Sequence, residues 1–421
     1  MNLANVIASK DVYNIIRQTL SMVNPDIMIH GEITGYILAK MLECESIYTR
    51  QDIADYAMLG VLHDIGLYKN EKHDSMFVLE NYDVWAHSIY GYLFLKYLSP
   101  MEEKADIILY HHLDYRLYNN VQNKYLKITS YLNIADKMDT FMHMQKGDVD
   151  PNYFKEYRDL TFSGQALDLF YRAENKFKII AKLRDGSYRL ELMNILAARI
   201  FSEDQKKRFL QMLIYTIDFR SVHTVDHTMA TTAFAREIAN CMRLPSIDQQ
   251  HLYYGALLHD VGKLAVPIEI LESPRRLNDE EMRIMKTHVE ITEDILTGVV
   301  NDAIVKIASR HHEKLDGTGY PRGLRGEELT LTQRIIAVAD IISALHGKRS
   351  YKDSMPAEEI KQILREDANN GKICKKVVDC TLRNYNTIML NFDKEQRETM
   401  KIYFMIKDQY DTIYEQFKEF G

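Results

Sequence analysis

Apolar residues recur every three or four positions along most of the chain, which is the pattern of helices that bury one face. Residues 229–244, MATTAFAREIANCMRL, show this period. Residues 278–296, NDEEMRIMKTHVEITEDIL, show it too, and they open with Asn278 as a candidate N-cap before acidic residues. The sequence has no sustained two-residue alternation enriched in Val, Ile and Thr, so a sheet-based fold is not expected. The pattern predicts an all-α fold.

The length of 421 residues favours two domains rather than one core. Between residues 181 and 205 the chain has a turn signal at Asp185-Gly186, followed by an apolar-striped helix. Ser202 and Gln205 then form a candidate capping box at the start of the next helix. We therefore expect an N-terminal domain at 1–180, a linker helix at 181–205, a second domain at 206–385 and a C-terminal helical extension at 386–421.

The composition narrows the classes of partner. A formal net charge of -7, with 46% hydrophobic and 27% charged residues, is typical of a globular protein that offers no basic surface to a nucleic-acid polymer. The N-terminus has no basic start followed by an apolar run, and no stretch of about 18 apolar residues occurs. The four cysteines are scattered, as free thiols in a reducing compartment would be. We expect a cytoplasmic protein with no membrane segment.

Histidines and aspartates recur in one order in each half of the chain. The first set is His30, His63-Asp64, His87, His111-His112 and Asp136, and the second is His227, His259-Asp260, His288, His311-His312 and Asp340. Successive intervals are 33 and 32 residues, 24 and 29, 24 and 23, and 24 and 28. The flanking segments MLGVLHDIG and YGALLHDVG are near copies as well. The chain therefore contains two copies of one unit, which predicts two tandem helical bundle domains.

Histidine and aspartate side chains are ligands of iron, manganese and zinc. A lone histidine on a helix is usually a satisfied core or surface residue, but an ordered set of seven donors is not explained in that way. An aspartate beside a histidine can bridge two ions while the histidine occupies a terminal position on one of them. Two-metal sites act on phosphoesters by generating a hydroxide and clamping the attacking and leaving oxygens. The repeated set thus predicts metal binding and phosphoester chemistry.

The second copy contains HDVGK at 259–263 and HHEKLDGTGYP at 311–321, with Asp340 further on. Over about residues 206–385 it resembles the HD-GYP family of bacterial cyclic dinucleotide phosphodiesterases, a branch of the HD superfamily. The first copy resembles only the wider superfamily. The resemblance implies a metal-dependent phosphodiesterase of bacterial second-messenger signalling.

Carried over by motif position, the resemblance implies two ions that share Asp260. One ion is held by His227, His259, Asp260 and Asp340, and the other by Asp260, His288, His311 and His312. Asp260 and Lys263 are the implied catalytic residues, since the lysine ammonium neutralises or protonates the scissile phosphate. Iron or manganese is favoured over structural zinc.

Substrate contacts are implied as well. Arg349 and Lys352 match basic positions that grip phosphates in the family, with a surface pair as the alternative. Gly319 and Tyr320 are expected as walls of the site. Four residues before His227, where some members have a Glu that helps to hold a third ion, this chain has His223. At that spacing the two imidazoles share a helix face, so His223 is a candidate third-ion ligand, with a noncatalytic polar role as the alternative.

The first copy keeps all seven ligand positions but loses the groups that would bind a phosphodiester. Leu67 stands where the lysine is expected, HHLDYRLYNN replaces the GYP loop, and Gln145 occupies the position of Arg349. We therefore expect a degenerate HD domain with a regulatory or structural role, holding a possible second metal site at His30, His63, Asp64, His87, His111, His112 and Asp136. A separate phosphomonoesterase activity is the alternative.

The leading hypothesis is hydrolysis of cyclic di-GMP or 3′,3′-cyclic GMP-AMP to a linear dinucleotide or mononucleotides. Two alternatives stay open: an HD-type nucleotidase acting on phosphomonoesters, and a non-catalytic diiron sensor. The Tyr-, Phe- and Met-rich stretch after about residue 386 is expected to serve in packing or as the surface of a homodimer.

Overall fold

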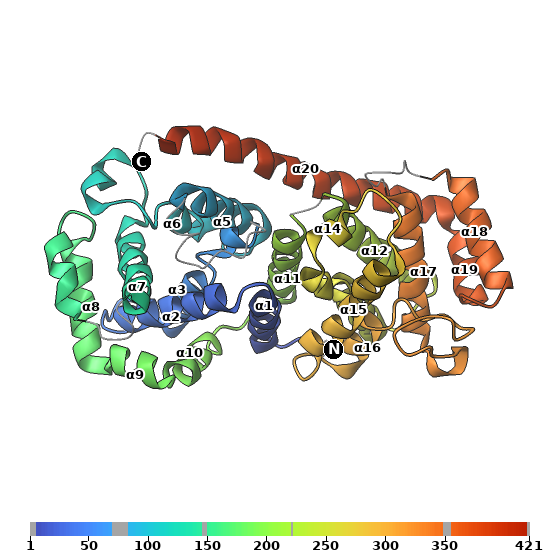
Figure 1. The fold of residues 1–421 in the computed structure, drawn as a ribbon, viewed down its shortest axis with the longest axis horizontal. Helices are drawn as coiled ribbons and strands as arrows, with labels where there is room; N and C mark the ends of the chain where they lie inside the picture. Colours follow the sequence, from blue (N-terminus) through green and yellow to red (C-terminus); the bar gives the residue numbers. More distant parts are fainter. Residues whose placement is uncertain (1–5, 70–82, 145–149, 220–221, 348–354, 419–421) are drawn as a thin grey trace. The chain divides into compact units, whose positions relative to one another are not determined.

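The computed structural model describes residues 6–69, 83–144, 150–219, 222–347 and 355–418. Helices make up most of these ranges, and the only β-type pairings within them are two isolated bridges, Arg158 with Phe162 and Asp316 with Arg325 (Figure 1). The predicted all-α fold is confirmed. None of the described helices combines the length and apolar character needed to cross a membrane.

The chain divides into two compact units, each of which holds one copy of the repeat. The first-copy unit comprises Asn24–Met212 and Met405–Gly421, and the second-copy unit comprises Met1–Val23 and Leu213–Phe404. The helix α11 (Glu203–Asp218) contributes to both units, as does the long helix α20 (Tyr385–Phe417).

The first-copy unit is built from helices that follow one another closely in sequence. Its α-helices are α2 (Pro25–Leu42), α3 (Arg50–Val61), α5 (Val84–Leu98), α6 (Asp106–Leu109), α7 (Leu126–Met144), α8 (Gly164–Phe177), α9 (Ile179–Asp185) and α10 (Tyr188–Leu196). Its short 3-10 helices are η1 (Ile65–Lys69), η2 (Glu102–Lys104), η3 (Tyr115–Asn120) and η4 (Pro151–Tyr157). The helix α2 lies against both α3 and α7.

The second-copy unit repeats this order and adds helices at its end. Its α-helices are α1 (Ser9–Val23), α12 (Val222–Cys241), α13 (Ser246–Leu258), α14 (Ile268–Leu271), α15 (Asp279–Leu296), α16 (Asp302–Ala308), α17 (Leu331–His346), α18 (Ala357–Asn369) and α19 (Lys375–Arg383). Its 3-10 helices are η5 (Val261–Ala265) and η6 (Gly326–Glu328). The helix α12 packs against α13 and α17, as α2 packs against α3 and α7.

The predicted helix starts are present. Asn278 and Glu281 form a reciprocal capping box at the start of α15, with backbone-to-side-chain distances of 2.8 and 2.9 Å. Ser202 and Gln205 do the same before α11, at 3.1 and 3.2 Å. Each box satisfies amide groups that would otherwise have no partner in the first helical turn.

The compact units and the expected sequence ranges divide the chain differently. The helix α1 contacts η5 and α15 of the second-copy unit, although it precedes the first copy. Within the 181–205 segment, α9 ends at Asp185, and α10 packs on α2 and α3. The ranges 1–180, 181–205, 206–385 and 386–421 follow sequence similarity, and as functional domains they stay a prediction.

Aromatic residues of α20 pack within each unit. Phe392 stacks on Phe234 with ring centroids 4.3 Å apart, and Tyr403 lies 4.6 Å from Phe219. In the first-copy unit, the ring of Tyr410 lies 4.1 Å from that of Tyr90. These contacts assign much of the apolar stripe of α20 to packing within the chain.

A glycine allows each His-Asp motif to approach the next histidine helix. A Cβ atom on Gly262 would lie 2.1 Å from the carbonyl oxygen of His288 and 2.7 Å from the amide nitrogen of Thr292. Gly66 stands in the same relation to His87, again at 2.1 Å. Since real Cβ atoms do not come so close to backbone, only glycine lets η5 and η1 lie directly on the helices that carry these histidines.

We expect Gly262→Ala to destabilise the second-copy unit by about 1–3 kcal/mol, because η5 must move away from α15. Urea denaturation followed by circular dichroism measures this change. Gly326→Ala is the control, since its Cβ would meet nothing closer than 3.7 Å. Equal stability of the two variants would show that the close approach is not required.

Candidate metal centre

The seven predicted ligands of the second copy come from six places in the helical bundle. His227 lies on α12, His259 caps the end of α13, Asp260 precedes η5, His288 lies on α15, His311 and His312 follow α16, and Asp340 lies on α17. The structure brings all seven together, and two sets of three have ligand atoms within 4.8 Å of one another: His227, His259 and Asp260, and His288, His311 and His312.

Asp260 lies between these two sets. Its Oδ2 atom is 3.5 Å from Nε2 of His227 and 3.2 Å from Nε2 of His259. Its Oδ1 atom is 3.4 Å from Nε2 of His288 and 3.8 Å from Nε2 of His311. The two oxygens of one carboxylate therefore face different sets of imidazoles, which is the arrangement that a bridging ligand needs.

Asp340 connects the remaining members of the cluster. Its Oδ1 atom lies 3.0 Å from Nε2 of His227, and its Oδ2 atom lies 3.5 Å from Nδ1 of His312. Both aspartates are buried. The two buried carboxylates and the two sets of imidazoles together form a donor set suited to first-row transition metals.

Backbone carbonyls orient three of the imidazoles. The Nδ1 atoms of His259, His288 and His311 lie 2.7, 2.6 and 2.6 Å from the carbonyl oxygens of Ala256, Met285 and Ala308. In each case Nδ1–H donates to the carbonyl, so the Nε2 lone pair points into the cluster. This orientation of the ring by its other nitrogen is usual for histidines that bind metal.

The electrostatics of the cluster leave its donors ready for a cation. Burial lowers the pKa of His288 and of His312 to about 4, so both rings are neutral at neutral pH. Burial alone would raise the pKa of Asp260, but His259 and Lys263 hold it well below its usual range. His259 differs from these two rings. Burial lowers its pKa, but the charge of Asp260 more than offsets that effect, so the pKa of His259 is raised.

Lys263 lies at the edge of the cluster. Its ammonium contacts Oδ2 of Asp260, and its side chain is 18% exposed while that of Asp260 is 3% exposed. The lysine thus reaches from the solvent-facing side of the site to the central carboxylate.

The loop at residues 314–325, which contains Gly319-Tyr320-Pro321 and is called the GYP loop, is tied to the cluster through Glu313. This glutamate is buried and comes directly after the paired histidines. Its two carboxylate oxygens accept hydrogen bonds from the amides of Arg322 and Leu324 at 2.7 and 2.8 Å. A Cβ on Gly319 would lie 2.4–2.6 Å from the backbone of residues 312–314, so Gly319 is held against that backbone. The ring of Tyr320 lies 4.7 Å from that of His312, where it forms a wall beside this ligand.

Three predicted site residues, and one residue aligned with them in the first copy, have side chains outside the described set. Arg349 and Lys352, and Gln145 at the corresponding place in the first copy, lie outside the described residues. His223 is on the helix α12, but its side chain is also outside the described set. The proposed roles of these residues stay predictions.

The first copy forms a second cluster of the same kind. Its seven donors form two sets, Asp64, His87, His111 and His112, and His30, His63 and Asp136. Oδ1 of Asp64 lies 3.4 Å from Nε2 of His87, and Oδ2 lies 3.8 Å from Nε2 of His30. Asp64 therefore contacts imidazoles of both sets, but the division differs from that at Asp260, because Oδ1 of Asp64 also lies 3.5 Å from Nε2 of His63.

Four residues that support the clusters were not predicted. Asp139 in the first copy and Ser343 in the second each contact the first histidine of their copy, and both stand three residues after the last aspartate. Lys137 lies 3.3 Å from Asp136 in the first copy, and Glu313 holds the GYP loop. An alignment of the two copies would have paired Asp139 with Ser343, but only the structure shows what they contact.

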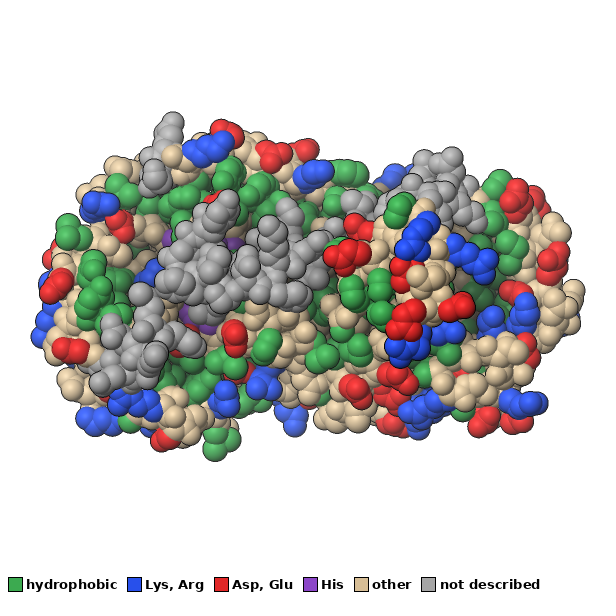
Figure 2. All heavy atoms as spheres, viewed as in Figure 1, with side chains coloured by type: hydrophobic (Ala, Val, Ile, Leu, Met, Phe, Trp, Pro, Cys, Tyr) green, Lys and Arg blue, Asp and Glu red, His purple; other side chains and the backbone are tan. Residues whose placement is uncertain are grey.

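The surface carries no large area of a single charge on the face seen in Figure 2, where acidic and basic side chains alternate.

Comparisons with known proteins place the second copy in context. The family model described as "HD domain" matches residues 211–377. The 3′3′-cGAMP-specific phosphodiesterase 1 of Vibrio cholerae is 28% identical over 390 residues, which cover 88% of this chain and 90% of that protein. A cyclic di-GMP phosphodiesterase of Thermotoga maritima is 35% identical over 223 residues, covering 51% of this chain and 60% of that protein.

Other relatives match over a shorter part. The 3′3′-cGAMP-specific phosphodiesterase 3 of Vibrio cholerae is 39% identical over 156 residues, or 37% of this chain and 34% of that protein. A crystal structure of a cyclic GMP-AMP-specific phosphodiesterase of Vibrio cholerae aligns with a TM-score of 0.56 at 18% identity, covering 90% of this chain and 98% of that one. At this identity the structural likeness establishes the fold alone.

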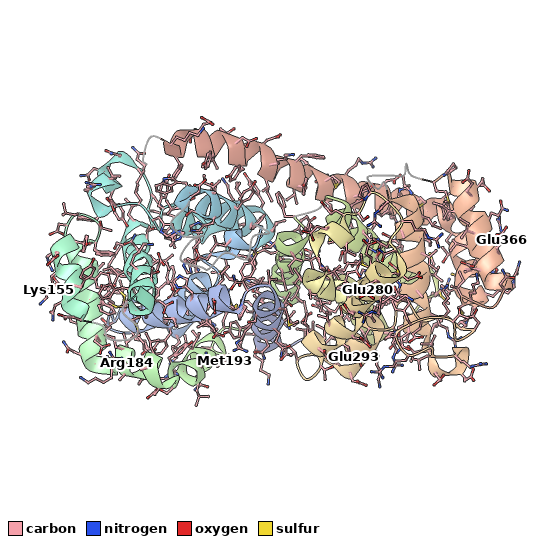
Figure 3. All side chains as sticks on the ribbon, in the orientation of Figure 1. Lys155, Arg184, Met193, Glu280, Glu293 and Glu366 are labelled. Atoms are coloured by element: carbon pink, nitrogen blue, oxygen red, sulfur yellow. The ribbon has the colours of Figure 1, made fainter. Side chains whose placement is uncertain are left out.

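We expect Glu313→Gln to loosen the GYP loop, because the amide group leaves one backbone N–H without an acceptor, at a cost of about 1–3 kcal/mol. Hydrogen exchange followed by mass spectrometry should show faster exchange at residues 314–325. Glu293→Gln is the control: Glu293, labelled in Figure 3, lies on α15 and pairs with the exposed side chain of Arg322. Unchanged exchange in Glu313→Gln would remove Glu313 from this role.

Proposed function

We propose that this chain is a member of the HD-GYP family of the HD superfamily and that its second copy hydrolyses a phosphodiester bond of a cyclic dinucleotide. The substrates that the relatives support are 3′,3′-cyclic GMP-AMP and cyclic di-GMP. The product is a linear dinucleotide, or mononucleotides if the second bond is also cut. Residues 206–385 are the proposed catalytic domain.

The observation that carries this proposal is the position of Asp260. Its two oxygens face separate sets of imidazoles, and the ammonium of Lys263 contacts it from the more exposed side. The seven donors would hold two divalent ions, and iron or manganese suits a mixture of imidazole and carboxylate ligands. A third ion would require His223.

When bound, two such ions supply a hydroxide nucleophile and neutralise charge on the attacking and leaving oxygens. The side chains of the chain then have distinct tasks. Asp260 and Asp340 provide the negative charge that retains cations in a buried site. The carbonyls of Ala256, Met285 and Ala308 hold three imidazoles in the tautomer that directs Nε2 inward.

Lys263 contacts the ligand Asp260, and in the proposed reaction it acts on the substrate as well. Its ammonium can donate to a nonbridging oxygen of the scissile phosphate and stabilise the charge that grows there as the P–O bond to the leaving 3′ oxygen breaks. Tyr320, held beside His312, forms a wall for the ligand. Arg349 and Lys352 are the proposed contacts to its phosphates. It stays a prediction which nucleobases the site prefers in its substrate, and so do the homodimer and the cytoplasmic location.

We expect Asp260→Asn to abolish cleavage of both cyclic dinucleotides and to lower the metal content, because the shared ligand loses its charge. Anaerobically purified full-length protein loaded with iron or manganese is incubated with 3′,3′-cyclic GMP-AMP or cyclic di-GMP, and products are separated by chromatography. Asp302→Asn, an exposed aspartate on α16, is the matched control.

The same assay separates the rival functions. Cleavage of a simple phosphomonoester without cleavage of either cyclic dinucleotide would favour a nucleotidase. Absence of all hydrolysis, together with a metal-dependent absorption spectrum that changes in air, would favour a diiron sensor. Cleavage that persists in Asp260→Asn would contradict the proposed site.

We expect Lys263→Gln to lower kcat/KM for the cyclic dinucleotide by about 100- to 1,000-fold, the range for loss of one donor to a developing oxyanion. Metal content should change little, since Lys263 is not a ligand. The control is Lys306→Gln, which removes an exposed ammonium paired with Asp302. An unchanged kcat/KM would show that Lys263 does not act on the substrate.

A further inference from the structure

The first-copy cluster is more enclosed than the second. The side chains of His30 and His112 are 0% and 3% exposed, whereas those of their counterparts His227 and His312 are 16% and 27% exposed. Asp64 and Asp136 are 3% and 0% exposed. The polar atoms of two carboxylates and five imidazoles are therefore shielded from solvent in this cluster.

The donors of this cluster are oriented for a cation. Nδ1 of His63 and of His111 donates to the carbonyl oxygens of Gly60 and Ile108 at 2.7 and 2.6 Å, so each Nε2 faces inward. All four carboxylate oxygens of Asp64 and Asp136 are buried without a hydrogen-bond donor among the described residues. The ammonium of Lys137 lies 3.3 Å from Oδ2 of Asp136. Buried anionic oxygens are costly unless a positive charge pairs with them, and a metal ion supplies that charge.

The residue behind the first histidine differs between the copies. Nδ1 of His30 lies 2.7 Å from Oδ2 of Asp139, and both side chains are at most 2% exposed. The corresponding Nδ1 of His227 lies 3.0 Å from the hydroxyl of Ser343. A carboxylate behind a histidine fixes the orientation of the ring and makes it a more basic ligand, and a neutral hydroxyl does this less.

We propose that the first-copy unit holds a transition-metal centre of its own, and that Asp139, acting through His30, makes this centre retain metal more firmly than the catalytic centre does. The ligands are His30, His63, Asp64, His87, His111, His112 and Asp136. Asp139 is a positioning residue. Leu67 replaces the lysine of the HD motif, and within the described part of the chain no ammonium is paired with Asp64 as Lys263 is with Asp260. The centre is therefore a retained metal site rather than a second cyclic dinucleotide site.

The first experiment measures metal bound to the full-length chain with one cluster disabled. Asp260→Asn/His311→Ala disables the catalytic cluster, and Asp64→Asn/His111→Ala disables the first-copy cluster. Each protein is loaded anaerobically with Fe(II) or Mn(II), desalted and analysed by mass spectrometry of the metal, and release into excess EDTA is then followed. We expect both variants to hold metal, and release from Asp260→Asn/His311→Ala to be the slower.

The second experiment exchanges the residues behind the histidines. In the background that keeps only the first-copy centre, Asp139→Ser should weaken metal binding about 10- to 100-fold. In the other background, Ser343→Asp should slow release. Asp168→Ser, an exposed aspartate of the first-copy unit, is the control. Asp139→Asn, which keeps the size of the side chain but not its charge, replaces Asp139→Ser if the latter fails to fold, as judged by circular dichroism.

The results decide the two parts of the proposal separately from hydrolysis. If Asp260→Asn/His311→Ala holds no metal while the wild type and Asp64→Asn/His111→Ala hold equal amounts, the first-copy centre is refuted. If metal is bound but Asp139→Ser or Asp139→Asn retains it as Asp168→Ser does, the role of Asp139 is refuted. Slower release in Ser343→Asp supports that role, because a purely structural function of Asp139 would not transfer to the other copy.

Discussion

The burial of a carboxylate between two sets of imidazoles is the constraint on which the rest of each bundle depends. Asp260 is 3% exposed, yet its pKa stays well below its usual range. An anion in such a place must have cationic or donor neighbours from several directions. The helices therefore have to converge, and each contributes a residue near its end or at its centre that points to the same spot.

Backbone geometry makes this convergence possible. Gly262 allows η5 to lie against α15, and the carbonyls at the ends of α13 and α16 orient His259 and His311. Glu313 then joins the paired histidines to the GYP loop through two backbone amides. The predicted ligands, the GYP loop and the helix termini form one connected network. A change in one of them therefore alters the positions of the others.

Duplication preserved the ligands and altered their surroundings. Both copies keep a central aspartate that contacts imidazoles of both sets. The second copy adds Lys263 at the central carboxylate and a tyrosine wall at His312, both suited to a phosphate that arrives from solvent. The first copy instead has Leu67 at the HD motif, Asp139 behind His30 and a more enclosed cluster. These differences suit the second copy to the proposed turnover of a substrate and the first copy to the proposed retention of a metal.

The sequence by itself determined the all-α class, the repeat and the fourteen candidate ligands. Helical periodicity and an ordered set of donors are patterns in the order of residues along the chain, so they do not depend on the tertiary structure. It also located the capping boxes at Asn278 and Ser202. Only the tertiary structure showed that α1 packs with the second copy, that the two oxygens of Asp260 face different histidines, and that Asp139, Ser343 and Glu313 support the clusters. These features are contacts between residues far apart in the chain, and their chemistry depends on distance, direction and burial, which no spacing along the sequence specifies.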